Sequence, residues 1–240
     1  MHIDIQWVPF PPSLEILSKK TVVVIDVLRA TSVIIEALSQ GAIEVIPVTT
    51  VEEAARLVKT FPRGSTLLGG ERGSRKIQGF DFGNSPKEYT AERVNGKRLI
   101  LTTTNGTKAF HSVAAAEDVL VGSLLNGTAV AERSLQLDRD VLIFPSGDEG
   151  AFSLEDVVCG GMLIDLMAKK SHTSNGLTDA SSSARILYQR FEGSLLEALR
   201  LSGHGKDLDA LGLGEDLFYC ARTDVTDLVP TFRENVIRAS

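Results

Sequence analysis

The chain has 240 residues and a formal net charge of −6, and 43% of its residues are hydrophobic and 23% are charged. This composition is typical of a soluble globular protein that is long enough for a large buried core. The acidic balance argues against nucleic acid or an anionic membrane surface as the main partner, and no apolar run approaches the roughly 20 residues needed to cross a bilayer.

Strands and helices alternate through the first half of the chain. Residues 21–25 form a continuous, mostly β-branched run, which is typical of a strand buried on both faces of a parallel sheet. The helix that follows is expected to end at Gly41, and Thr50 with Glu53 has the pattern of a capping box. In chain order we expect strands at 3–7, 21–25, 43–48 and 65–68, with helices after residues 32 and 50.

The same alternation continues in the second half. Ser85 and Glu88 form a second capping box with Pro86 at the first helical position, and Ser153 with Asp156 begins the longest helix. Residues 171–183 are polar and are expected to form a loop, followed by helical pieces interrupted at glycines. In chain order we expect strands at 98–101, 119–121, 140–144 and near 228–231, with helices ending near residues 116, 134 and 169.

Strands alternating with helices predict an α/β protein whose mainly parallel sheet is flanked by helices. We expect a single domain over residues 1–240. Both halves contain units of strand, polar loop and helix, so a division into two similar lobes at about 1–122 and 123–240 stays open, with the site in the crevice between their loops.

The N-terminus and the cysteines favour a cytoplasmic protein. The first four residues lack the basic start and apolar core of a secretory signal. Cys159 and Cys220 provide neither a disulfide framework nor zinc-binding spacing, and the histidines are scattered singly. Cys159 is expected to lie in the core.

The segment from residue 69 to residue 86 is the strongest candidate for function. It combines the acids Glu71 and Asp81 with several bases and five glycines, and it has no helical or strand periodicity. Carboxylates can bind a hard divalent cation, and Arg72 can bind phosphate or sulfonate through its planar fork of donors. An ordinary surface loop has similar composition, but a loop of this length inside a compact domain is usually functional or disordered.

Four polar segments each follow a predicted strand and lead into a helix. The carboxyl ends of parallel strands lie at one edge of a sheet, where ligands bind, and helix N-termini there offer free N–H groups to an anion. We therefore expect these segments to line one crevice. They comprise residues 26–32, 70–85, 102–107 and 146–153.

Carboxylates dominate these segments, and a carboxylate-rich site suits Mg²⁺. Glu155 and Asp156 can equally be helix-capping residues. Asp26 is harder to explain structurally, because an acid at the end of an apolar buried strand is costly without a partner or a task. Arg29 is a candidate phosphate ligand or the partner of an internal ion pair. The acids in question are Asp26, Glu71, Asp81, Asp148, Glu149, Glu155 and Asp156.

Common nucleotide and nucleophile motifs are missing from these segments. There is no Walker lysine followed by serine or threonine, no GxGxxG and no Gly-x-Ser-x-Gly elbow. Residues 102–107 carry hydroxyl groups and an Asn-Gly pair that can form an anion nest or simply a turn and helix cap.

Taken together, five motifs spread over nearly the whole chain resemble the 2-phosphosulfolactate phosphatase family. Ser74 departs from the expected glycine, and Pro145-Ser146-Gly147 departs from the family pattern by lacking a cysteine. The motifs are Asp26-Val27-Leu28-Arg29-Ala30-Thr31-Ser32, Gly70-Glu71-Arg72-Gly73, Gly79-Phe80-Asp81-Phe82-Gly83-Asn84-Ser85-Pro86, Thr102-Thr103-Thr104-Asn105-Gly106-Thr107 and Phe152-Ser153-Leu154-Glu155-Asp156.

The resemblance implies a Mg²⁺-dependent phosphoric monoester hydrolase that converts (R)-2-phospho-3-sulfolactate to (R)-3-sulfolactate and phosphate, a step of coenzyme M biosynthesis in archaea. The expected catalytic residues are Asp26, Arg29, Glu71, Arg72 and Asp81. The expected substrate-binding residues are Thr31, Ser32, Asn84, Ser85, Thr104, Asn105, Gly106, Thr107 and Ser146. The expected metal ligands are Asp26, Glu71, Asp81 and Asp156.

Three other functions remain open from the sequence. The protein can be a phosphatase for another small phospho-hydroxy acid, a non-catalytic phosphate- or anion-binding protein, or an ATP-dependent kinase, although the missing nucleotide motif counts against a kinase. We expect a small anionic phosphate ester as partner and neither nucleic acid nor membrane. A homodimer is also considered, but no sequence feature shows its interface.

Overall fold

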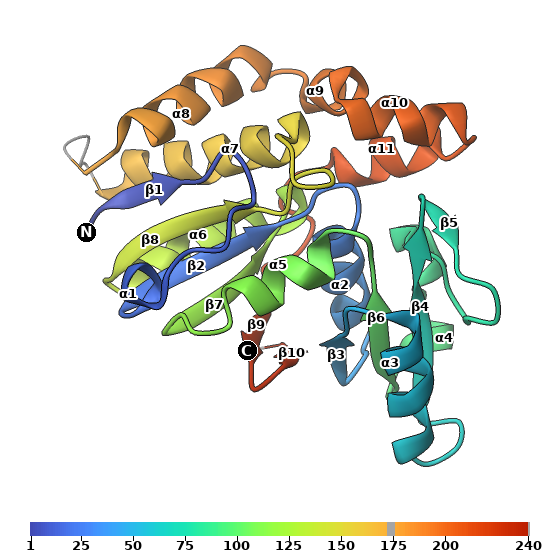
Figure 1. The fold of residues 1–240 in the computed structure, drawn as a ribbon. Coiled ribbons are helices and arrows are strands. Elements are labelled where there is room, and N and C mark those ends of the chain that lie inside the picture. The colour runs from blue at the N-terminus through green and yellow to red at the C-terminus, as the bar shows by residue number, and fades with distance from the viewer. Residues whose placement is uncertain (172–175, 240) are drawn as a thin grey trace.

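A computed structural model describes residues 1–171 and 176–239 and shows an open, mostly parallel sheet flanked by helices, which confirms the predicted α/β class (Figure 1). Within these residues the sheet has ten strands in the order β1-β8-β2-β7-β9-β10-β3-β6-β4-β5. The strands are β1 (Ile3–Ile5), β2 (Lys20–Ile25), β3 (Glu44–Pro47), β4 (Thr66–Arg72), β5 (Arg75–Lys76), β6 (Arg98–Thr102), β7 (Asp118–Gly122), β8 (Asp140–Pro145), β9 (Thr231–Arg233) and β10 (Val236–Arg238).

The helices mostly follow strands, as the alternating pattern predicts. The α-helices are α1 (Leu14–Leu17), α2 (Ala30–Ser39), α3 (Val51–Leu57), α4 (Ala91–Val94), α5 (Gly106–Ser112), α6 (Gly127–Gln136), α7 (Leu154–Ser171), α8 (Asp179–Phe191), α9 (Leu195–Leu201), α10 (Gly203–Ala210) and α11 (Gly214–Cys220). Short 3₁₀ helices occupy Val58–Thr60, Pro86–Glu88 and Leu124–Asn126.

The sheet contains two parallel groups of strands. Strands β1, β8, β2 and β7 form one group, and β3, β6 and β4 form the other. The antiparallel pair β9–β10 connects β7 to β3, so the two groups run in opposite senses along the ladder. The groups also stand at a wide angle to each other (Figure 1). Because of this angle, the carboxyl ends of β2 and β4 lie near the same region of the molecule.

The run in β2 is buried on both faces, as its continuous apolar sequence predicts. Val23 and Ile25 pack with α6 and α7 in one core cluster. Val22 and Val24 pack with α2 and α5 in another. Cys159 on α7 is fully buried in the first cluster, which confirms its predicted place in the core.

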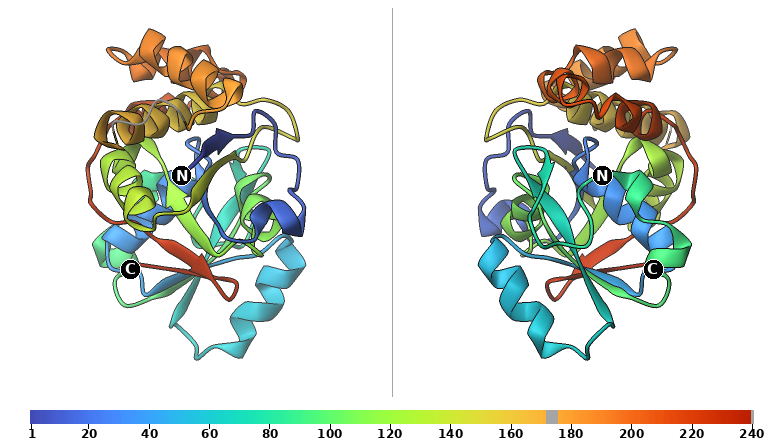
Figure 2. Two further views of the ribbon diagram at one scale, coloured as in Figure 1. Left: turned by 90° about the vertical axis from the view of Figure 1, so that its left-hand side faces the viewer. Right: turned by 90° about the vertical axis from the view of Figure 1, so that its right-hand side faces the viewer.

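The longest helix, α7, carries a second helical layer. Helix α8 packs along α7, and α9, α10 and α11 continue this layer towards β5 (Figure 1). The views in Figure 2 show this helical layer at one end of the molecule and α3 at the other. Within the described residues, no helix is long and apolar enough to span a membrane.

The glycine-rich segment is more regular than predicted. Strand β4 continues through Gly69 and Gly70 to Arg72 and turns back into the two-residue strand β5. The end of this strand was not predicted because Gly69 and Gly70 have no side chains and therefore show no alternation of apolar and polar residues. At Gly70 a Cβ would stand 2.1 Å from the Thr102 carbonyl oxygen, so only glycine permits this approach to β6.

The predicted capping box at Ser85 is wrong. Ser85 makes no side-chain cap, and Pro86–Glu88 is a 3₁₀ helix. The Glu88 carboxylate instead accepts hydrogen bonds from the Gly83 N–H, at 2.9 and 3.1 Å. The spacing of Ser85 and Glu88 could not predict these partners, because the spacing describes only contacts within the helix itself.

Three other boundaries also differ from the predictions. The first strand ends at Ile5 and does not reach Trp7. The strand expected near 228–231 lies later and pairs with a strand that was not predicted, β10. Helix α8 begins at Asp179, inside the predicted loop 171–183; residues 172–175 of that loop lie outside the described residues.

The strand groups are interleaved along the chain. Strand β7 ends at Gly122 and β8 begins at Asp140, so they lie on either side of the boundary considered near residue 122. Both of them pair with β2. The single domain and the alternative division near residue 122 stay predictions.

Candidate active site

A pocket of about 490 Å³ lies where the carboxyl ends of the two strand groups meet. Residues from all four predicted segments line it, and α10 closes one side. The lining residues are Asp26, Leu28, Arg29, Glu71, Gly73, Ser74, Asn84, Thr103, Thr104, Asn105, Asp148, Glu149, His204, Asp207, Ala210 and Leu211.

Asp26 directly follows β2 and is almost completely buried in the wall of this pocket. Its Oδ1 accepts a hydrogen bond from the Ala30 N–H at 3.0 Å, in the first turn of α2. Burial raises the pKa of Asp26, and Glu71 raises it further, against the lowering effects of the Ala30 N–H, His204 and Ser146. The first turn of α2 therefore orients one oxygen of the Asp26 carboxylate, and the groups around Asp26 shift its pKa in opposing directions.

Two further acids lie behind Asp26, at the start of α7. Asp156 accepts a hydrogen bond from the Val27 N–H at 2.8 Å, and its other oxygen accepts from Ser146 Oγ at 3.3 Å. Burial, together with the charges of Glu155 and Asp26, raises the pKa of Asp156 well above its ordinary value. Glu155 is also buried, and its Oε2 has no hydrogen-bond partner. Asp156 is thus placed to support the residue 26–32 loop, and it does not line the pocket.

Glu71 enters the pocket from the end of β4, in the other strand group. Its Oε1 accepts from the Thr104 N–H at 2.7 Å, and its Oε2 accepts from the Ser74 N–H at 2.9 Å and from Thr104 Oγ1 at 3.2 Å. These three hydrogen bonds hold a charged carboxylate at the junction of β4 and β6. Ser74 donates through its backbone N–H, and its backbone lies in the left-handed region at φ 61°, where glycine was expected from the family pattern.

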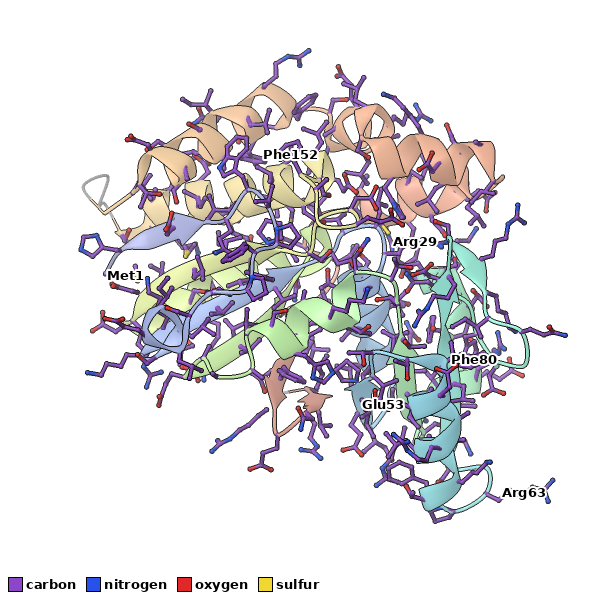
Figure 3. The ribbon with its side chains drawn as sticks, viewed as in Figure 1. Met1, Arg29, Glu53, Arg63, Phe80 and Phe152 are labelled. Carbon is purple, nitrogen blue, oxygen red and sulfur yellow. The ribbon has the colours of Figure 1, made fainter. Side chains whose placement is uncertain are left out.

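Arg29 is the pocket's buried cation (Figure 3). Its NH1 donates to Asp216 Oδ2 at 2.6 Å, and its NH2 donates to the Ser74 carbonyl at 3.2 Å. Arg29 therefore forms the internal ion pair that was one of its two predicted roles, and its role as a phosphate ligand stays a prediction for a residue that lines the pocket. Asn84 lines the same wall, and its buried Oδ1 has no hydrogen-bond partner.

Residues 102–107 and 146–153 meet at the rim. Asn105 Oδ1 accepts from the Glu149 N–H at 3.2 Å, and its amide donates to Asp148 Oδ1 at 3.4 Å. A second pocket, of about 430 Å³, adjoins the first and shares Thr104, Asn105 and Glu149 with it. Ser146 lines this second pocket.

Two predicted catalytic residues lie outside both pockets. Arg72 donates to the Glu71 and Thr49 carbonyls and to Thr102 Oγ1, so its guanidinium ties β4 to neighbouring backbone. Asp81 is exposed and accepts from the Leu68 N–H at 2.8 Å. These contacts favour a structural role for both side chains. Arg72 points away from the pocket because successive residues of a strand face opposite sides, and Glu71 faces the pocket.

Three predicted substrate-binding hydroxyls are fully buried and point to backbone. Thr31 Oγ1 donates to the Asp26 carbonyl at 2.8 Å, and Ser32 Oγ donates to the Val27 carbonyl at 2.8 Å. Thr107 exchanges hydrogen bonds with Thr103 at 3.1 to 3.2 Å. None of the three lines either pocket of the described structure, so they shape the loops that present the site.

The pocket also includes residues that sequence reasoning did not select. His204 and Asp207 line it from α10. Asp216 on α11 does not line the pocket but pairs with Arg29, which does. Each is isolated in the sequence, and no motif marks them. They enter the site only because the helical layer folds back over the carboxyl ends of the strands.

The donor set fits a hard cation, although no three His, Cys, Asp or Glu side chains of the described residues form a ready metal cluster. Magnesium is commonly bound by one or two carboxylates, with water and substrate phosphate completing its shell. Of the four predicted ligands, Asp26 and Glu71 line the pocket, whereas Asp156 lies behind it and Asp81 lies outside it. The fit therefore rests on Asp26 and Glu71.

Comparison with known proteins gives a consistent family. A family model described as 2-phosphosulpholactate phosphatase matches residues 11–235. A protein of Caldanaerobacter subterraneus subsp. tengcongensis named "Probable 2-phosphosulfolactate phosphatase" is 46% identical over 224 residues, which cover 93% of this chain and 92% of the relative. Proteins of the same name are 43% identical over 99% of this chain and 100% of the relative in Clostridium tetani, and 42% identical over 96% and 98% in Symbiobacterium thermophilum.

Proposed function

This chain belongs to the 2-phosphosulfolactate phosphatase family, and from that premise we propose that it is a Mg²⁺-dependent hydrolase that converts (R)-2-phospho-3-sulfolactate to (R)-3-sulfolactate and phosphate. It is a phosphatase, as its curated relatives are named. A cytoplasmic location, a place in coenzyme M biosynthesis and a homodimer stay predictions.

The charge balance of the pocket lining carries this proposal. Five carboxylates line it, from Asp26, Glu71, Asp148, Glu149 and Asp207, against one arginine and one histidine. A substrate that bears phosphate, carboxylate and sulfonate groups would be repelled by such a lining. A divalent cation at the carboxylates removes this conflict, because it attracts both the protein acids and the phosphate oxygens.

Asp26 is the best candidate for the attacking group. Its Oδ1 accepts a hydrogen bond from the Ala30 N–H, and its Oδ2 lies beside Gly106, the first residue of α5. Attack of the carboxylate on phosphorus forms a phosphoryl-aspartate and breaks the bond to the ester oxygen, and the released alkoxide takes a proton from water. The hydroxide left by this proton transfer then attacks the phosphorus of the phosphoryl-aspartate, which releases phosphate and restores the Asp26 carboxylate.

The remaining pocket residues bind and orient the substrate in this proposal. Arg29 and Asn84 provide donors on one wall, and Thr104 and Asn105 lie at the rim between the two pockets. Asp26 and Glu71 would hold Mg²⁺, which supplies charge neutralisation at the phosphate oxygens.

Phosphate release tests the proposal directly. We expect release from 2-phosphosulfolactate that requires Mg²⁺, stops with EDTA and exceeds release from phospholactate and from an aryl phosphate. Equal release from all three esters would keep the phosphatase and reject the sulfonate substrate. Metal-independent release would reject the Mg²⁺ requirement. No release from any ester by protein with a normal thermal transition would reject the catalytic proposal in favour of anion binding.

A further inference from the structure

A single buried carboxylate, that of Asp216 on α11, connects the C-terminal helices to the pocket. Its Oδ2 accepts from Arg29 NH1 at 2.6 Å, and its Oδ1 accepts from Ser85 Oγ at 2.6 Å. Asp216 and Arg29 are only 3% and 2% exposed, respectively. The three residues are distant in the sequence, and the carboxylate uses both of its oxygens to hold them together.

The same contacts leave the Nε of Arg29 unpaired. Its Nε–H is buried and has no hydrogen-bond partner, while NH1 and NH2 are occupied by Asp216 and the Ser74 carbonyl. A guanidinium serving only as the partner of an ion pair is expected to have its buried donors satisfied. The unpaired Nε–H belongs to a residue that lines the pocket, where an anionic substrate group can accept from it.

We infer that Asp216 is a positioning residue: by binding NH1 of Arg29, it directs the unpaired Nε–H of the guanidinium towards an anionic group of the substrate. Asp216 itself does not line the pocket. The carboxylate fixes the orientation of the arginine fork, and orientation determines whether a planar guanidinium can bind an anion. The inference rests on the proposed function for the identity of that anion.

A second ion pair on the same two segments provides a control. Glu215, the neighbour of Asp216 on α11, pairs with Lys87, which is two residues after Ser85. The Glu215 and Lys87 side chains are 80% and 46% exposed, so this pair contributes little to either stability or the pocket. Removing the Glu215–Lys87 pair breaks a contact between α11 and residues 85–88 but leaves the Asp216–Arg29 pair intact. The comparison therefore shows whether substrate binding depends on the Arg29 contact in particular.

The experiment compares Asp216→Asn with Glu215→Gln in steady-state hydrolysis of 2-phosphosulfolactate. For Asp216→Asn we expect KM to rise about tenfold or more while kcat stays within about threefold, because a charge-assisted hydrogen bond that aligns a binding group is lost. Glu215→Gln should leave both constants within about twofold. Equal effects of the two variants, or an Asp216→Asn defect confined to kcat, would overturn the inference.

A double-mutant comparison separates positioning from a general structural defect. If Asp216 acts through Arg29, adding Asp216→Asn to Arg29→Lys should raise KM no further than Arg29→Lys alone. An additional tenfold rise in the double variant would show that Asp216 acts elsewhere. If Asp216→Asn does not fold, Ser85→Ala loosens the same carboxylate without removing a charge and should raise KM by about threefold.

Binding of inorganic phosphate by calorimetry keeps this test independent of turnover. If the native protein hydrolyses no ester, the proposed function fails, and the inference is decided by whether Asp216→Asn weakens phosphate binding about tenfold while Glu215→Gln does not. Unchanged or undetectable phosphate binding in all proteins would then reject it.

Discussion

Gly106 lies directly against the carboxylate of Asp26: a Cβ at Gly106 would stand 2.5 Å from Asp26 Oδ2 and 2.5 Å from the Ala30 Cβ. The two residues come from different loops, after β2 and after β6, and therefore from both strand groups. A glycine at the start of α5 thus permits the close approach that brings the two halves of the pocket together.

Gly106→Ala is expected to displace Asp26 and to lower kcat/KM by at least about 100-fold, because an imposed shift of a reacting group of about 1 Å is enough for such a loss. Steady-state phosphate release measures it. Gly193→Ala is the control, since a Cβ there meets no atom within 4 Å. Normal activity in Gly106→Ala would show that the position of Asp26 is unimportant.

Asp26→Asn should abolish turnover, with kcat falling by about 10⁴-fold or more if Asp26 is the nucleophile. Asp81→Asn offers a matched comparison, because Asp81 belongs to the same motif set but is exposed outside the pocket. We expect Asp81→Asn to retain activity within about fivefold and to lose less than about 1 kcal/mol of stability, because the amide oxygen of asparagine can still accept from the Leu68 N–H. A dead Asp81→Asn enzyme with native stability would instead place Asp81 in the chemistry.

Thr104→Val removes the hydroxyl that donates to Glu71 Oε2 but keeps the backbone donor to Oε1. Glu71 should then be held less firmly, and we expect kcat/KM to fall by about 10-fold, with more Mg²⁺ needed for half-maximal rate. Titration of activity with Mg²⁺ checks both effects. Thr90→Val is the control, because Thr90 is an exposed helix-cap residue whose side chain makes no cap hydrogen bond.

Acid should weaken the junction between the strand groups through Glu44. Its carboxylate accepts from Arg98 Nε at 2.6 Å and from Arg238 NH2 at 2.6 Å, which links β3 to β6 and β10. Although desolvation acts to raise it, the net effect of the two arginines lowers the pKa of Glu44 below 4.5. The depressed folded-state pKa means that this stabilisation is present above pH 4.5 and is lost as the pH falls through the folded value.

Urea unfolding checks this dependence. Glu44→Gln should cost about 1 to 2 kcal/mol at pH 7, a modest value because both arginines are partly exposed, and the difference from the native protein should shrink below about pH 4.5. The exposed Glu92→Gln variant should show neither effect. A difference between native and Glu44→Gln proteins that stays constant with pH would contradict the charge-based explanation.

Local sequence determined the parts of this protein that depend on periodicity and chain direction. The β-branched run 21–25 became a strand buried on both faces, and polar loops after parallel strands were correctly expected to meet at strand ends. These predictions succeed because the pleat, the helix period and the βα connection are short-range properties of the chain. They placed Asp26, Glu71 and Asn105 in one site.

Tertiary structure alone decided which way side chains point and which distant residues join them. Arg72, at the end of β4, and Asp81, after the β4–β5 hairpin, bind backbone groups, and Ser85 binds Asp216 instead of capping its own helix. His204 reached the pocket, and Asp216 reached Arg29 in the pocket wall, from helices of a second layer that packs over α7. No local pattern encodes such contacts, because they join separate elements of the fold, which for Arg29 and Asp216 are 187 residues apart in the sequence.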